Sequence, residues 1–128
     1  MKLEHVALNV PNALETVKWY TEHLGMRVVR GNSQSPFIHF LADSTGTSVL
    51  EFFSNPIAPV PDYAAMHPVM LHLAFLVDDI EAERDRLVQA GATAEGDTAT
   101  APNGDQVAFV RDPWGVAVQL VKRTTPLT

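Results

Sequence analysis

Residues 71–77, LHLAFLV, repeat the pattern of residues 3–10, LEHVALNV. In both stretches apolar residues recur with a period of two, which is typical of a β-strand that buries one face. A histidine, His5 or His72, lies on the other face of each predicted strand. Because the two stretches match in pattern and in the position of this histidine, the chain contains an internal repeat, and its architecture follows from the repeated unit.

Each of these strands is followed by a predicted helix and then by three further predicted strands. The first helix begins at Asn12, which forms a capping-box pattern with Glu15, and ends at Gly25. The second helix covers residues 78–91 and also ends in a glycine. The further strands are predicted at 26–31, 37–42 and 47–53, and at about 92–98, 106–111 and 116–122. The sequence therefore predicts an α+β fold with two βαβββ modules.

A proline-rich connector separates the two modules. Residues 55–69, NPIAPVPDYAAMHPV, contain four prolines, which exclude a central strand or a long helix. The connector either links the two halves or covers a pocket. A chain of 128 residues is most simply one domain, residues 1–128, with module 1 at about 1–54 and module 2 at about 70–123.

The composition is that of an ordinary globular protein, with 46% hydrophobic and 19% charged residues. No apolar run approaches the length of a membrane span, and the first residues lack the apolar core of a signal peptide. Cysteine is absent, which fits a reducing compartment, so we expect a cytoplasmic protein. The net charge of −6 argues against nucleic acid, because a nucleic-acid surface needs basic residues. A small-molecule substrate is the expected partner.

Four polar side chains occupy matched positions within the strands of the two modules. His5 corresponds to His72, and Glu51 corresponds to Gln119. Apart from Glu4, their neighbours along the strands are apolar, so we expect the four side chains to face away from the helices. Burying such groups without partners costs about 1–3 kcal/mol each. Imidazole and carboxylate groups are ligands for Zn, Ni, Fe, Co or Mn, so the sequence predicts one divalent metal ion held by these residues.

A metal-free interpretation stays open beside this one. A single inward-facing histidine is more often a hydrogen-bonded core residue than a metal ligand, and a single strand glutamate more often lies at an edge or mouth. In this interpretation the four polar residues bond to one another or to a ligand. The protein would then bind a small molecule without a metal.

The motifs resemble those of the vicinal oxygen chelate superfamily, which includes glyoxalase I, extradiol dioxygenases and bleomycin-resistance proteins. The similarity is carried by EHVALNV (4–10), KWYTEHLGM (18–26), VLEFF (49–53), LHLAFLVDDI (71–80) and AFVRDPWGVAVQLV (108–121). The resemblance implies a half-open, eight-stranded barrel around one metal ion, and a homodimer. It also implies that the ligands come from the first and last strands of each module, which here are His5, Glu51, His72 and Gln119.

The resemblance further implies a metal-dependent lyase or isomerase of the glyoxalase I type. Such an enzyme acts on a small oxygen-chelating substrate through a metal-stabilised enediolate. Glu51 is the expected catalytic base, because the amide of Gln119 cannot accept a proton. Glyoxalase I-like members commonly carry a glutamate at the fourth position, so Gln119 departs from the family pattern. An Fe(II)-dependent extradiol-type dioxygenase is the alternative, with His5, His72 and Glu51 as its two-histidine, one-carboxylate set.

An apolar substrate pocket with few polar groups is expected beside the predicted ligands. Its predicted members point to the same face of the sheet as these ligands or lie near them: Asn9, Ile38, Phe40, Phe53, Val107, Phe109, Arg111 and Val121. Among these residues, Arg111 could hold an anionic group. The sequence shows no concentrated basic patch of the kind expected for CoA or glutathione, and so it does not support a thiol cosubstrate.

Overall fold

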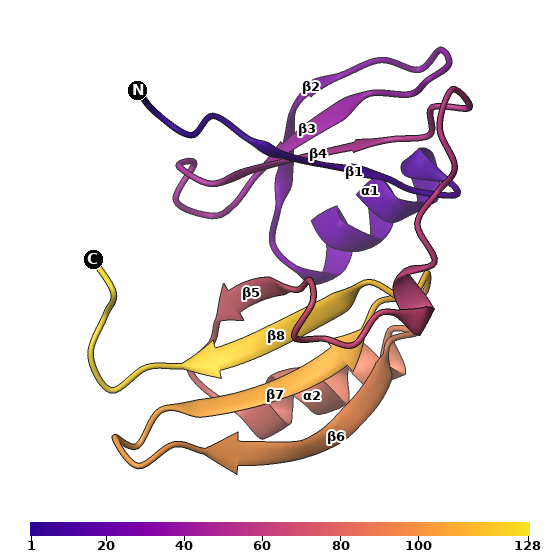
Figure 1. Ribbon diagram of the computed structural model, residues 1–128. Helices are drawn as coiled ribbons and strands as arrows, with labels where there is room; N and C mark the ends of the chain where they lie inside the picture. The colour runs from indigo at the N-terminus through magenta and orange to yellow at the C-terminus, as the bar shows by residue number, and fades with distance from the viewer. The chain divides into compact units, whose positions relative to one another are not determined.

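The computed structural model describes residues 1–128 and contains two compact units, Met1–Pro61 and Asp62–Thr128 (Figure 1). The first unit contains β1 (Val6–Asn9), α1 (Ala13–His23), β2 (Arg27–Gly31), β3 (His39–Ala42) and β4 (Val49–Phe53). The second contains the 3-10 helix η1 (Tyr63–Ala65), β5 (Leu73–Leu76), α2 (Ile80–Gln89), β6 (Thr93–Thr100), β7 (Gln106–Arg111) and β8 (Ala117–Lys122). The predicted α+β fold with two βαβββ modules is therefore confirmed.

Each unit holds one four-stranded sheet, and the two sheets have the same strand order. The first sheet runs β1-β4-β3-β2 and the second runs β5-β8-β7-β6. The first strand of each module pairs in parallel with the last, β1 with β4 and β5 with β8, whereas the other neighbours are antiparallel. A parallel pair needs a crossover connection, and α1 and α2 lie within these connections.

The register of the last strand with its two neighbours repeats in the two sheets. Ala7 pairs with Glu51 in the first sheet, and Ala74 pairs with Gln119 in the second. On the other side of the last strand, Phe40 pairs with Glu51 and Phe109 pairs with Gln119. The repeat inferred from the sequence is thus a repeat of strand pairing as well. Glu51 and Gln119 occupy the same position in two equivalent sheets.

The first helix begins after Asn12, the capping residue that the sequence indicates, and the second begins after Asp79, within the predicted range 78–91. The Asn12 side chain accepts a hydrogen bond from the Glu15 backbone N–H at 3.1 Å, and Asp79 accepts one from the Ala82 N–H at 3.0 Å. These bonds satisfy N–H groups that have no partner within the helix. Gly91 follows α2 with a φ of +107°, a conformation that favours glycine. None of the helices has the length and the apolar run that a membrane span requires.

In the first unit, one face of the sheet is covered by α1 and the other carries the polar positions. Leu41 and Phe52 are fully buried, and the Phe52 ring lies 4.8 Å from the Tyr20 ring of α1, measured between centroids. Side chains alternate between faces along a strand, so Glu51 points to the face opposite α1. Phe40, its partner in the register, lies on that face too.

The start of the proline-rich connector is attached to the first unit, and its end belongs to the second unit. The Asn9 side chain donates hydrogen bonds to the backbone carbonyls of Asn55 and Ala58 and accepts one from the Asn55 N–H. Residues 63–65 form η1 and belong to the second unit. The sequence predicts a single stiff connector over 55–69, but only its middle part lies between these attachments.

Candidate functional site

His5 and Glu51 meet on the face of the first sheet that is opposite α1. The His5 Nε2 atom lies 3.0 Å from the Glu51 Oε2 atom, and the Glu51 side chain is only 13% exposed. Two ligand atoms that bind one cation at about 2.0–2.2 Å lie about 3.0–3.4 Å apart at angles between 90° and tetrahedral. The spacing of these two atoms therefore suits adjacent ligands of one divalent ion.

The other nitrogen of His5 contacts a second carboxylate. Its Nδ1 atom lies 2.6 Å from the Oε2 atom of Glu4. This hydrogen bond, together with the negative charges of Glu4 and Glu51, raises the pKa of His5 above its ordinary value of 6.5, although burial opposes the shift. The edge of the His5 ring also packs against Phe40, with 5.2 Å between ring centroids. The imidazole is thus held by contacts on three sides.

His72 is held in a similar way in the second unit. Its Nδ1 atom lies 2.7 Å from the backbone carbonyl oxygen of Pro68, and its ring packs edge-on against Phe109 with 5.4 Å between centroids. A carbonyl oxygen only accepts, so Nδ1 carries the proton and Nε2 carries the lone pair in the neutral ring. Gln119 is half-buried and pairs with Phe109 in the register. The second module thus repeats the histidine and phenylalanine arrangement of the first.

Each unit supplies two of the four predicted ligands. Nowhere do three or more His, Cys, Asp or Glu side chains gather as a metal-binding group. In the first unit the two predicted ligands, His5 and Glu51, are in contact. In the second unit the counterparts are His72 and Gln119, of which only the histidine belongs to the usual ligand types. The binding of one ion by all four residues stays a prediction.

A pocket of about 270 Å³ lies beside this pair in the first unit. It is lined by Glu4, Val29, Arg30, Phe40 and Val49. Of these residues the sequence identifies only Phe40. Val29 and Arg30 belong to β2, whose residues are all exposed, and no periodic pattern distinguishes them from a solvated edge strand. Glu4 could have been found from its position next to His5.

The other predicted pocket residues are placed by the sheet register. Asn9 pairs with Phe53, and Val107 pairs with Val121. Phe53 lies two residues beyond Glu51 and Val121 two beyond Gln119, so both share a face with their predicted ligand. Ile38 directly precedes β3 and is half-buried. The Asn9 amide holds the connector as described above, and a pocket role for these residues stays a prediction.

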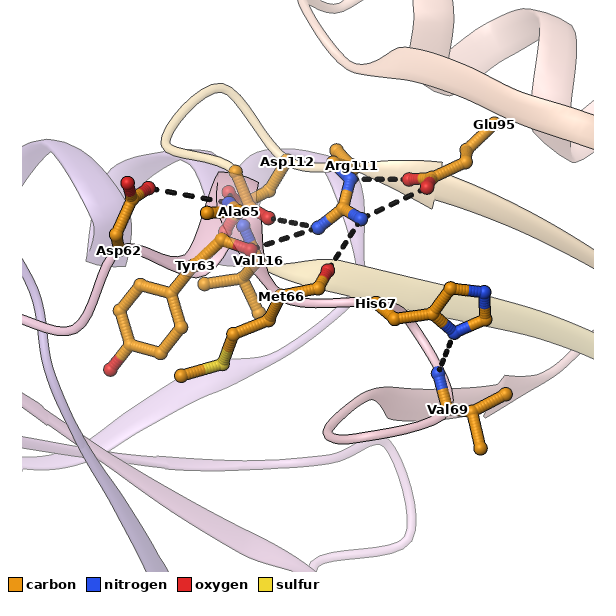
Figure 2. A network of polar contacts seen from close by, with 11 residues as sticks. Asp62, Tyr63, Ala65, Met66, His67, Val69, Glu95, Arg111, Asp112 and Val116 are labelled. Carbon is orange, nitrogen blue, oxygen red and sulfur yellow. Dashed lines mark hydrogen bonds and ion pairs between the residues drawn. The ribbon is translucent and has the colours of Figure 1, made fainter.

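Arg111 is the centre of a network of polar contacts that the sequence does not reveal (Figure 2). Its guanidinium donates to the backbone carbonyls of Tyr63, Met66 and Gly115 at 2.7–3.0 Å. Its remaining two contacts are with the carboxylate of Glu95, through Nη2 and Nε. Four of its five N–H donors thus form hydrogen bonds, and Nε forms an ion pair with the Glu95 carboxylate. Arg111 therefore fastens η1 to β6 and β7, and its role toward an anionic group of a substrate stays a prediction.

Comparison with known proteins identifies the family of the chain. The profile of the Glyoxalase/Bleomycin resistance protein/Dioxygenase superfamily matches residues 2–120. A probable lactoylglutathione lyase of Vibrio parahaemolyticus is 28% identical over 94% of this chain and 90% of its own length. The lactoylglutathione lyase of Salmonella typhimurium is 26% identical over 95% of this chain and 93% of its own.

Solved structures show the same fold. A glyoxalase family protein from Enterococcus faecalis is 30% identical, with a TM-score of 0.68 over 94% of this chain and 96% of that protein. A glyoxalase family protein from Bacillus cereus is 17% identical, with a TM-score of 0.79 over 95% of this chain and 93% of its own. The profile match covers nearly the whole sequence and both βαβββ modules. The chain belongs to the glyoxalase/bleomycin resistance protein/dioxygenase superfamily.

Proposed function

We propose that this chain is a metal-dependent lyase or isomerase of the glyoxalase I type. It would move a proton between neighbouring carbons of a small substrate that carries two adjacent oxygens. The observation that carries the proposal is the contact of His5 with Glu51 at a position that His72 and Gln119 repeat in the second module. Relatives named lactoylglutathione lyase, matched over most of their length, support the same class.

The donor atoms fit a divalent metal ion. Two imidazoles, one carboxylate and one amide oxygen carry a net charge of about −1, which leaves a bound divalent ion with positive charge for substrate oxygens. His5 and His72 would bind through Nε2, because each Nδ1 already has an acceptor at 2.6–2.7 Å. When bound, the ion supplies Lewis-acid stabilisation of the negative charge that develops on the substrate oxygens.

Glu51 performs the proton transfer in this proposal. Its carboxylate is mostly buried, lies within hydrogen-bonding distance of His5, and shares a sheet face with Phe40 of the pocket. It would take the proton from one carbon and return it to the next. Gln119 can orient a substrate oxygen or bind the metal, but its amide cannot take up a proton. A single base restricts the chemistry to one face of the substrate.

The direct test is turnover of a hemithioacetal by the protein loaded with Zn or Ni. We expect activity in the wild type and a loss of about 100-fold or more in Glu51→Gln, as for removal of a general base. Glu22→Gln is the matched control, because it removes the same charge from the exposed surface of α1. Turnover that is absent with every metal, or equal in Glu51→Gln and wild type, would contradict the proposal.

The ligand chemistry also supports a second candidate, a ring-cleaving dioxygenase. His5, His72 and Glu51 make a two-histidine, one-carboxylate set, which is typical of non-haem Fe(II) oxygenases. This candidate predicts oxygen uptake with catechols by the Fe(II)-loaded protein. Elemental analysis after metal reconstitution separates both candidates from a metal-free binding protein. If the chain retains no metal, its function is the metal-free binding of a small molecule.

A further inference from the structure

We propose that Glu4 is a positioning residue, which holds the His5 imidazole with Nδ1–H directed to its own carboxylate and Nε2 directed toward Glu51. The Nδ1 atom lies 2.6 Å from the Glu4 Oε2 atom, and the Nε2 atom lies 3.0 Å from the Glu51 Oε2 atom. This inference rests on the proposed function, in which Nε2 of His5 binds a metal ion. It adds a residue outside the four predicted ligands.

The two carboxylates compete for one proton. A neutral imidazole carries a single N–H, and the hydrogen bond made by one nitrogen decides which tautomer is present. A proton on Nε2 would block the atom that has to bind the metal and would occupy the Glu51 oxygen at the same time. A proton on Nδ1 leaves both of these atoms free. The contact to Glu4 is 0.4 Å shorter than the contact to Glu51, so Glu4 is the better acceptor.

In the second module a different acceptor fixes the tautomer of the histidine. The Nδ1 atom of His72 lies 2.7 Å from the Pro68 carbonyl oxygen, which fixes the same tautomer. Both modules therefore direct Nδ1 to an acceptor and leave Nε2 for a ligand, although the acceptor is a backbone group in one and a carboxylate in the other. Partners of this kind orient histidine ligands and raise their basicity. Only the acceptor of His5 can be removed by mutation.

A purely stabilising role does not account for the Glu4 contact. The Glu4 side chain is 77% exposed, and exposed ion pairs contribute little to folding. The sequence also contains a matched control, because the dipeptide Glu-His recurs as Glu22-His23 on α1. There the His23 Nε2 and Glu22 Oε2 atoms lie 3.8 Å apart, beyond hydrogen-bonding distance. At these atoms the second Glu-His dipeptide does not repeat the short contact of the first.

The first test measures the tautomer of His5 in metal-free protein by nitrogen-15 NMR, at a pH where the imidazole is neutral. We expect the Nδ1–H form in the wild type and in Glu22→Ala, and a shift toward the Nε2–H form in Glu4→Ala. This readout does not depend on a metal. An unchanged tautomer in Glu4→Ala would overturn the inference, whether or not the protein binds a metal.

The second test is titration with Zn(II), with Co(II) as a spectroscopic probe of the ligand geometry. We expect Glu4→Ala to weaken the affinity about 10–100-fold, as for loss of other groups that orient a ligand. Glu4→Gln should fall between Glu4→Ala and wild type, because its amide oxygen still accepts from Nδ1 but carries no charge. Equal affinities in Glu4→Ala and Glu22→Ala would overturn the inference. A wild type that binds no metal contradicts the proposed function instead, and the NMR result then decides the role of Glu4.

Discussion

At the scale of single residues, His5 connects the candidate site to the stability of the fold. The hydrogen bond to Glu4 and the negative charges of Glu4 and Glu51 raise its pKa above 6.5. The protonated form is therefore favoured in the folded state, and its contribution to stability is fully present below pH 6.5. This contribution is lost as the pH rises through the folded-state pKa.

The corresponding prediction concerns His5→Gln in the metal-free protein. We expect the wild type to exceed this variant in free energy of unfolding by the largest amount below pH 6.5, and the difference to shrink at higher pH. Urea unfolding at a series of pH values measures it. A difference that is independent of pH would mean that the two carboxylates do not stabilise the imidazolium form.

At the scale of elements, the attachment of η1 to the second sheet depends on Arg111. Replacement by lysine keeps the charge but loses the fork that reaches three carbonyl groups and Glu95. We expect Arg111→Lys to lower the free energy of unfolding by about 2 kcal/mol, since buried acceptors lose their partners. Arg86→Lys is the control: its exposed pair with Glu83 should contribute less than about 1 kcal/mol. Equal losses in urea unfolding would contradict this role of Arg111.

The turn between β7 and β8 also contacts η1, at Gly115. This residue has a φ of +96°, and a Cβ atom there would lie 2.8 Å from the backbone nitrogen of Ala64. Gly115→Ala should therefore combine about 1–2 kcal/mol of backbone strain with a steric clash. Gly96→Ala is the control, because Gly96 has a φ of +66° with nothing within 4 Å of the added atom. Thermal unfolding should show a larger loss for Gly115→Ala, and equal losses would mean that η1 moves aside.

The strands and helices could be predicted from the sequence, but these long-range contacts could not. Alternation in the first strand of each module, capping residues, turn signals and the internal repeat together predicted all eight strands and both helices. The acceptors of Arg111 are backbone carbonyls up to 48 residues away, and a carbonyl has no sequence signature. Leu14 fits a helical stripe with Val17 but is 46% exposed. The buried face of α1 includes Ala13 and Thr16 instead.

At the scale of the whole molecule, the chain contains the same βαβββ module twice, with a different polar residue on the last strand of each. The two sheets agree in strand order and in register, and both hold a histidine against a phenylalanine. They differ at the last strand, where one module carries Glu51 and the other Gln119. The repeat made these positions predictable from the sequence. The contact of Glu4 with His5 was not predicted, because an exposed charge beside a strand is usually only solvated.

This equivalence leads to a prediction about exchanging the two side chains. If the modules contribute equivalent positions to one cation, as proposed, Glu51→Gln should weaken Zn(II) binding tenfold or more, which is about 1.4 kcal/mol. Gln119→Glu alone should strengthen binding, because it adds a charged ligand. The double variant Glu51→Gln/Gln119→Glu should recover the affinity of the wild type in a metal titration.

The double variant should regain the metal without regaining the original reaction, because its only carboxylate then belongs to the other module. Turnover of the hemithioacetal should stay low, or its product should have the opposite configuration at the carbon that receives the proton. A double variant that binds metal as weakly as Glu51→Gln would show that position 119 does not reach the cation. The equivalence of the two modules would then extend to strand register and not to ligand chemistry.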